Sequence, residues 1–219
     1  MIIDRIHVGI LSNEQVLIDA LQLRSASSPR TEVVWSSAAT EDIPKASIPP
    51  ALDVMLLDID AGDGIALRLA SDLRVNPGNM KLLFLGARVT DICLEQAMRI
   101  QADGFVLKTD PLDRVVEAIE TVADGKKFFS GRIHDRLTYN DKKKRHSLRV
   151  DPPLGVLTNR QLDILRLLAN GDSVKAVARK LHLSPKSVDS HKYRIMLKIG
   201  VNDRVHLSRY AIREGLIPA

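Results

Sequence analysis

The fold of this chain is decided by residues 157–217, which read LTNRQLDILRLLANGDSVKAVARKLHLSPKSVDSHKYRIMLKIGVNDRVHLSRYAIREGLI. Apolar residues recur through this stretch at helical spacing, and residues that start or stop helices interrupt it. The residues able to cap a helix at its start are Thr158 (with Gln161 completing a capping box), Ser184 (followed by Pro185) and Asn202. Gly171 supplies a left-handed stop after the first helix. These signals predict four short helices, over about 159–170, 174–181, 185–200 and 203–214.

The second and third of these helices are joined by a short turn, which is the geometry of a helix-turn-helix whose second helix fits the major groove of DNA. In the third helix, Val188, Ile195 and Ile199 can form the buried stripe. The residues at or near its outer face, which we predict to contact DNA, are Lys186, Ser187, Asp189, Ser190, Lys192, Tyr193, Arg194 and Lys198. The alternative interpretation is a small helical bundle with a solvated basic surface.

The charge distribution favours the DNA interpretation. Residues 154–219 hold 12 Lys and Arg against 5 Asp and Glu, and residues 140–153 hold 5 against 2. Residues 1–139 hold 15 against 20. The whole-chain net charge of +5 therefore conceals a polarised molecule, and a polyanion suits only its basic end.

Three segments of the basic end resemble the DNA-binding domain of LuxR/NarL-type transcriptional regulators: LTNRQLDILRLLANG, VARKLHLSPKSVDSHKYRIMLKIGV and R-x-x-L-x-x-Y-A. One departure is Gln161, where the family usually has Glu. The resemblance implies that residues 187–198 form the recognition helix. Residues matching the family's base and phosphate contacts are Asp189, Ser190, Lys192, Tyr193 and Lys198. Asp189 accepts from a cytosine amino group, tunes specificity by repelling wrong sites, or is a surface residue of the first helical turn.

One recognition helix reads only a few base pairs, so a homodimer is expected. The same resemblance implies that its contact is the last helix, residues 203–214. Leu207 and Tyr210 are the candidate dimer residues. The alternative is that both side chains pack within their own domain. We predict double-stranded DNA as the partner, read by two copies of the chain.

Residues 1–125 alternate strand and helix patterns. Apolar or β-rich runs of strand length cover residues 6–11, 31–35, 54–58, 81–85 and 104–108, with helical patterns between them. This order predicts an α/β fold, a doubly wound five-stranded parallel sheet of the flavodoxin-like kind. We expect residues 1–125 to form this domain and residues 154–219 the helical one. Residues 126–153 would be a linker, basic and flexible in its later part, which includes Lys142–Arg145.

Two residues close predicted strands at the edge where such sheets bind ligands: Asp58 and Lys108. Together with the segment ADGFVLK (residues 102–108), they resemble the receiver domain of response regulators, and the two domains together resemble the NarL/FixJ architecture. The resemblance implies that Asp58 is the phosphoacceptor, that Lys108 pairs with the phosphoryl group, and that Phe105 is the switch aromatic.

The departures from the receiver pattern concern metal and phosphate chemistry. Ser12 and Asn13 occupy the positions of the acidic pair that holds Mg²⁺ in receivers, and Gly86 occupies the position of a hydroxyl residue. Glu14 is one residue late. The sequence therefore makes Mg²⁺ binding doubtful and predicts no cofactor. It favours a receiver-like domain in which Asp58 and Lys108 form a structural ion pair, over regulated phosphorylation of Asp58.

The remaining features are sparse. Cys93 is the only cysteine, which suits a reducing cytoplasm, and no apolar run approaches membrane-spanning length. We predict a cytoplasmic regulator, not an enzyme, with no metal site and no membrane partner. The leading hypothesis is a DNA-binding transcription regulator controlled without aspartyl phosphate, through dimerisation or a regulatory protein. The alternatives are a conventional response regulator that receives phosphate from a histidine kinase, and an interaction protein that sequesters other regulators.

Overall fold

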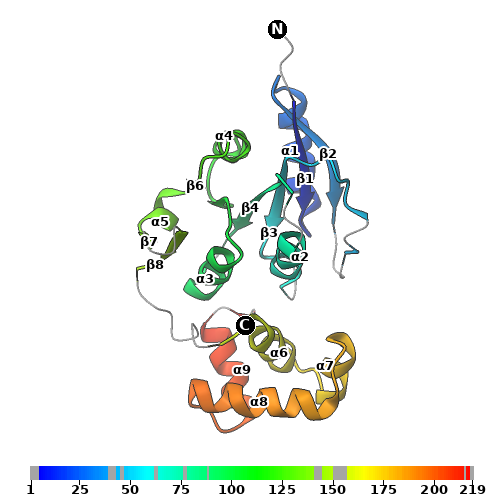
Figure 1. The fold of residues 1–219 in the computed structure, drawn as a ribbon, viewed down its shortest axis with the longest axis vertical. Helices are drawn as coiled ribbons and strands as arrows, with labels where there is room; N and C mark the ends of the chain where they lie inside the picture. Colours follow the sequence, from blue (N-terminus) through cyan, green and yellow to red (C-terminus); the bar gives the residue numbers. More distant parts are fainter. Residues whose placement is uncertain are drawn as a thin grey trace. The chain divides into compact units, whose positions relative to one another are not determined.

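The computed structural model describes residues 5–38, 43–44, 47–61, 64–75, 78–87, 89–140, 145–149, 157–214 and 216–217. The chain divides into two compact units, with the main boundary at residue 150. The first is built around a β-sheet and the second is helical (Figure 1). Among the described residues, no helix combines the length and the apolar character needed to cross a membrane.

Six parallel strands form the sheet in the described part of the N-terminal unit, in the order β2-β1-β3-β4-β5-β6. The strands are β1 (Ile6–Leu11), β2 (Thr31–Ser37), β3 (Val54–Asp58), β4 (Lys81–Gly86), β5 (Gly104–Leu107) and β6 (Phe128–Phe129). The helices that connect them are α1 (Gln15–Ala26), α2 (Ile65–Val75), α3 (Asp91–Arg99) and α4 (Leu112–Ala123). The order 2-1-3-4-5 is that of the flavodoxin-like doubly wound sheets. The predicted fold class is confirmed.

The central strands are buried on both faces of the sheet. All five residues of β3 and all four of β5 are buried, which explains why they read as continuous apolar runs. Residues of α1 and α4 such as Ile18, Leu21 and Ile119 pack in one cluster with Ile10 and Leu56 of the strands.

The prediction of five strands is corrected to six, because β6 pairs with β5 through Gly104 and Phe128. The pairing is close: a Cβ on Gly104 would lie 2.6 Å from the backbone oxygen of Phe128. The region expected to be a linker also holds α5 (Gly131–His134) and an antiparallel hairpin of β7 (Leu137–Asn140) and β8 (Arg145–Leu148). Residues 128–140 and 145–148 are therefore folded. Lys142, Lys143 and Lys144 lie outside the described residues.

Four helices form the described part of the C-terminal unit: α6 (Asn159–Ala169), α7 (Val174–Lys180), α8 (Pro185–Ile199) and α9 (Arg204–Arg213). Thr158 and Gln161 form the predicted capping box, and Ser184 caps α8 through the backbone N–H of Ser187. Gly171 and Gly200 have left-handed φ values of 101° and 70°.

One predicted cap is wrong. Asp203, not Asn202, caps α9 and accepts from the backbone N–H of His206. Asp110 does not cap α4. Its carboxylate instead accepts from the backbone N–H of Leu107 and from the hydroxyl of Ser130, which ties the end of β5 to the residue after β6.

Candidate functional sites: a carboxylate cluster and a basic helix face

The carboxyl ends of β1, β3 and β5 bring the predicted Asp58 and Lys108 together. Nζ of Lys108 lies 2.8 Å from Oδ2 of Asp58. The same carboxylate oxygen accepts from the hydroxyl of Ser12 at 2.6 Å, and Oδ1 accepts from the backbone N–H of Asp60 at 3.0 Å. Both oxygens of Asp58 are therefore engaged within the protein.

Two further carboxylates reach the same amine. Nζ of Lys108 lies 2.6 Å from Oε1 of Glu14 and 3.3 Å from Oδ2 of Asp60. Asp60 is held in place because its Oδ2 also accepts from the backbone N–H of Ala87 at 2.7 Å. We call Asp58, Asp60 and Glu14, gathered around Lys108, the carboxylate cluster. Asp60 was not predicted as a site residue. The one hint in the sequence was its position, two residues after Asp58 at the end of β3.

Burial and hydrogen bonding act in opposite directions on the pKa values of Asp58 and Lys108. The side chain of Asp58 is 1% exposed and that of Lys108 is 11% exposed. Burial raises the pKa of the Asp58 carboxyl, against the opposite effect of the hydrogen bonds from Lys108 and Ser12. Burial alone would lower the pKa of Lys108, but its hydrogen bonds to Asp58 and Glu14 raise that pKa to about 12. Lys108 is therefore firmly protonated at neutral pH.

Three other residues matched to receiver positions, Gly86, Phe105 and Asn13, are not among the hydrogen-bond and ion-pair partners of Asp58 described above. A Cβ on Gly86 would lie 2.6 Å from Cγ1 of Ile59, so the Ile59 side chain fills the space beside Gly86. Phe105 is fully buried and stacks on Phe84, with ring centroids 5.9 Å apart. Its ring is thus part of the core. Nδ2 of Asn13 is 3.5 Å from the backbone oxygen of Asp60, too far for a strong hydrogen bond.

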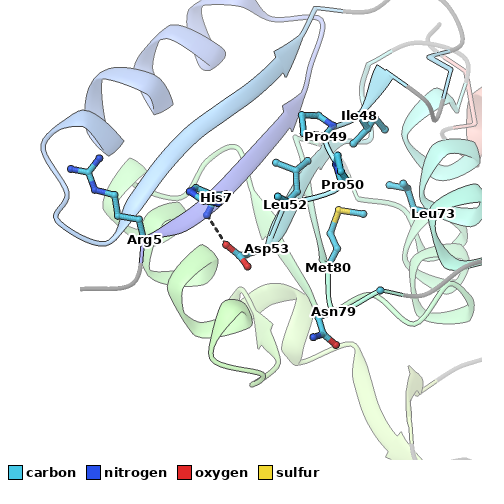
Figure 2. A pocket seen from close by; sticks show the side chains of 12 residues that line it. Arg5, His7, Ile48, Pro49, Pro50, Leu52, Asp53, Leu73, Asn79 and Met80 are labelled. Atoms are coloured by element: carbon cyan, nitrogen blue, oxygen red, sulfur yellow. Dashed lines mark hydrogen bonds between the residues drawn. The ribbon is translucent and has the colours of Figure 1, made fainter. Parts of the chain in front are cut away.

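A pocket of about 810 Å³ lies at the opposite edge of the sheet, beside the amino ends of β1, β3 and β4 (Figure 2). Ile48, Leu52 and Met80 contribute apolar side chains to it. Asp53, one of the polar residues that line it, accepts from the backbone N–H of His7 at 2.8 Å. The carboxylate cluster lies beyond the other end of β3, so this pocket has no part in the chemistry expected of Asp58.

The second candidate site is the outer face of α8. Val188 and Ile195 are fully buried, and the opposite side of the helix is open. A shallow hollow of about 750 Å³ on that side is lined by Lys186, Asp189, Ser190, Tyr193 and Arg194. These are five of the eight predicted DNA-contacting residues. Among the described residues, Lys186 and Arg194 have no ion-pair partner.

The other three predicted contacts have partners within the protein. Ser187 is half-buried and its hydroxyl lies 2.8 Å from that of Ser184 at the helix cap. Lys192 pairs with Asp189 at 2.9 Å, and Nζ of Lys198 donates to Oε1 of Gln161 at 3.1 Å. Asp189 is the fifth residue of α8 and lies beyond its first turn, so the first-turn interpretation of this residue is wrong.

The predicted dimer residues do not lie on a surface. Leu207 is 1% exposed and Tyr210 is 8% exposed, because both pack in the core of their own unit. The exposed apolar residues of α9 are instead Val205 and Ile212, at 61% and 39%. Sequence analysis also missed Leu197 of α8, which is 71% exposed.

The C-terminal unit thus has the geometry of a helix-turn-helix, with a basic helix free on its outer side. The unit before it has the strand order and the buried aspartate–lysine pair of a response-regulator receiver. Together they define the class of protein, a DNA-binding response regulator.

Comparison with known proteins agrees. Residues 155–211 match the family described as bacterial regulatory proteins, luxR family. The chain is similar to the response regulator UvrY of Escherichia coli (strain K12), with 26% identity over 188 residues that cover 86% of this chain and 85% of UvrY. It is similar to the transcriptional regulatory protein DegU of Brevibacillus brevis, with 25% identity over 230 residues that cover 98% and 96%. The oxygen regulatory protein NreC of Staphylococcus aureus (strain bovine RF122 / ET3-1) is 29% identical over 168 residues, which cover 75% and 77%.

Among solved structures, the RcsB response regulator of Salmonella typhimurium shares the fold, with a TM-score of 0.67, 20% identity and coverage of 94% of this chain and 96% of that one. The chain therefore carries a LuxR-family DNA-binding domain and is a homologue of the NarL/FixJ-type response regulators. Of these relatives, DegU is a transcriptional regulatory protein and UvrY is a response regulator.

Proposed function

We propose that this response regulator binds duplex DNA through the outer face of α8 and is controlled without phosphorylation of Asp58. The observation that carries the DNA part is the hollow on α8, where the cations of Lys186 and Arg194 have no ion-pair partner among the described residues. Exposed cations of this kind neutralise phosphates and release counterions. Because duplex DNA is the proposed partner, the cytoplasm remains the predicted location.

The proposal of control without aspartyl phosphate rests on the carboxylate cluster. The oxygens of Asp58 accept from Ser12, Lys108 and a backbone N–H, so none points freely at a phosphodonor. Beside Gly86, the position of the missing hydroxyl is filled by the apolar side chain of Ile59. A phosphoryl group on Asp58 would lack the hydroxyl partner that the receiver pattern supplies.

The residues do not fit the Mg²⁺ ion that the receiver pattern implies. Mg²⁺ requires near-octahedral oxygen ligands, usually including carboxylates. Here the hydroxyl of Ser12 donates a hydrogen bond to Asp58, and the three carboxylates of the cluster turn toward the amine of Lys108. Within the described ranges, no three acidic, His or Cys residues are grouped so as to hold a metal ion. The Lys108 amine, at +1, is the cation around which these side chains gather.

DNA binding is tested by titrating a fluorescent duplex of mixed sequence with the full-length chain at 50, 100 and 200 mM salt. We expect affinity to fall steeply with salt, since each neutralised phosphate contributes a slope of about −0.9 in log K against log salt. Absence of binding at 50 mM salt, or an affinity that does not change with salt, would refute the DNA part of the proposal.

Control without aspartyl phosphate is tested by incubating the full-length chain with acetyl phosphate and Mg²⁺ and measuring its intact mass. We expect no added phosphoryl group, and Asp58→Asn serves as the matched baseline. A phosphoryl group present in the wild type and lost in Asp58→Asn would favour the conventional, kinase-fed regulator. The position of Glu14 favours this second candidate, because its carboxylate contacts Lys108 beside Asp58.

We also propose that two copies pair through α9. Val205 and Ile212 are seven residues apart, two turns of helix, so their exposed side chains lie on one face. The double variant Val205→Glu/Ile212→Glu should sediment as a monomer and bind DNA more weakly, because a monomer reads one half-site. Val75→Glu, on an exposed residue of α2, is the control. A double variant with wild-type sedimentation would exclude this surface.

A further inference from the structure

The outer face of α8 has a central stripe that points directly away from the core. Its members follow the helical spacing of four, three and four residues: Lys186, Ser190, Tyr193 and Leu197. The buried residues Val188 and Ile195 lie on the opposite side of the helix, with 0% exposure each. A helix that enters a groove with its outer side would therefore lead with this stripe.

The stripe changes character along the helix. Its first half is charged or polar, with Lys186 and Ser190, whereas its second half is apolar. Tyr193 is 69% exposed and Leu197 is 71% exposed. A single exposed leucine on a protein surface is ordinary. Here two large apolar side chains adjoin at i and i+4 on the helix face that would meet DNA.

The major groove offers one apolar group, the C5-methyl of thymine, among donors and acceptors that polar side chains read. A phosphate has no apolar group to offer the side chain of Leu197 or the ring of Tyr193, whereas the cations of Lys186 and Arg194, which line the same hollow as Tyr193, are suited to phosphates. We propose that Tyr193 and Leu197 read thymine, by packing against C5-methyl groups in the major groove. This inference rests on the proposed DNA-binding function.

A second copy of the chain is the competing occupant of this stripe. Charge argues against it, because Lys186 and Arg194 line the same hollow as Tyr193 and are not neutralised by an ion pair among the described residues. Two identical faces of this kind would bring like charges together, which is unfavourable at an interface. Duplex DNA satisfies the cations and the apolar pair at once.

The experiment begins by selecting binding sites from a random-sequence duplex pool with the full-length chain. Each thymine of the selected site is then replaced singly by deoxyuracil, which removes only the methyl group. We expect at least one replacement to weaken binding by about fourfold, the effect of one buried methyl group. If Leu197 touches that methyl group, the same replacement should not change DNA binding by Leu197→Ala. If Tyr193 touches it, the replacement should not change DNA binding by Tyr193→Ala.

Conservative variants separate contact from folding. Leu197→Met and Tyr193→Phe keep an apolar side chain, so they should keep the sensitivity to deoxyuracil. Both residues are mostly exposed, so none of these changes should unfold the domain. A selected site without thymine, or deoxyuracil effects that are absent or persist in both alanine variants, would overturn the inference while leaving DNA binding intact. Failure to enrich any duplex, with no salt-dependent binding, would instead refute the proposed function and the inference with it.

Discussion

The carboxylate cluster and the outer face of α8 both concentrate charge, yet they use it in opposite ways. In the cluster, Lys108 lies within 3.3 Å of three carboxylates, and the acceptor-like Asp58 is 1% exposed. On α8, Lys186 and Arg194 line an open hollow and have no ion-pair partner among the described residues. The first set of charges is satisfied internally, whereas the second is available to a partner.

This difference bears on where the protein can respond to its surroundings. A buried ion pair that is fully hydrogen-bonded stabilises one arrangement, and removing one member leaves a costly unpaired charge. Exposed cations on a helix can neutralise the phosphates of a polyanion and release its counterions without breaking contacts inside the protein. We therefore expect changes in the cluster to act on stability and changes on α8 to act on binding.

The largest effect expected from this comparison is that of Lys108→Met. It should lower the free energy of unfolding of the N-terminal unit by about 3–5 kcal/mol at pH 7, because the buried Asp58 would lose its cation. Asp58→Asn should lower the free energy of unfolding much less, since Lys108 would keep its ion pairs with Glu14 and Asp60. Urea unfolding followed by the fluorescence of Trp35, the only tryptophan, reports on this unit.

The two variants also provide a way to break the comparison. Equal losses of stability in Lys108→Met and Asp58→Asn would mean that the cluster does not depend on the lysine as its shared cation. A loss of DNA affinity in folded Asp58→Asn would mean that the cluster controls the basic helix after all.

The second effect concerns the helix. Lys186→Ala/Arg194→Ala should weaken binding of a mixed-sequence duplex roughly 50-fold at 0.1 M salt and reduce the salt slope by about 2, one unit for each lost phosphate contact. Its stability should not change, because both side chains are exposed. Fluorescence anisotropy across a salt series measures both quantities. Lys126→Ala/Arg132→Ala removes two exposed cations of the N-terminal unit and should leave the slope unchanged.

Much of the fold could be predicted from the sequence because most strands and helices are long enough to show an apolar pattern. Strands β1 and β3 have the predicted bounds, since their apolar residues stop abruptly at the polar Ser12 and Asp58. Strand β6 was missed because two residues carry no periodicity, and it forms only where Gly104 lets Phe128 approach. The cap of α9 was misplaced by one residue because Asn202 and Asp203 are both good caps.

The sites were predictable where backbone topology decides them and not where side-chain packing does. Parallel strands end at one edge, so the meeting of Asp58 and Lys108 could be expected. The rotation of Glu14 and Asp60 toward Lys108 depends on loop conformation, which no residue pattern encodes. On α9, helical spacing alone could not decide which apolar side faces the core, and Leu207 and Tyr210 are on the buried one.

The smallest expected effect is a dependence of stability on alkaline pH. The pKa of Lys108 is raised from 10.5 to about 12 in the folded protein, mainly by its carboxylate partners acting against burial. Its contribution to stability is therefore fully present below pH 10.5 and is lost as pH rises through 12. A shift of this size corresponds to about 2 kcal/mol.

That contribution is isolated by comparing the wild type with Lys108→Met in urea unfolding at several pH values from 9 to 12.5. Groups common to both proteins titrate in both, so their effects cancel in the difference. We expect the difference in unfolding free energy to shrink by about 2 kcal/mol across this range. A difference that stays constant would show that the amine does not gain its partners on folding, and the cluster would then resemble the exposed face of α8 more than the geometry indicates.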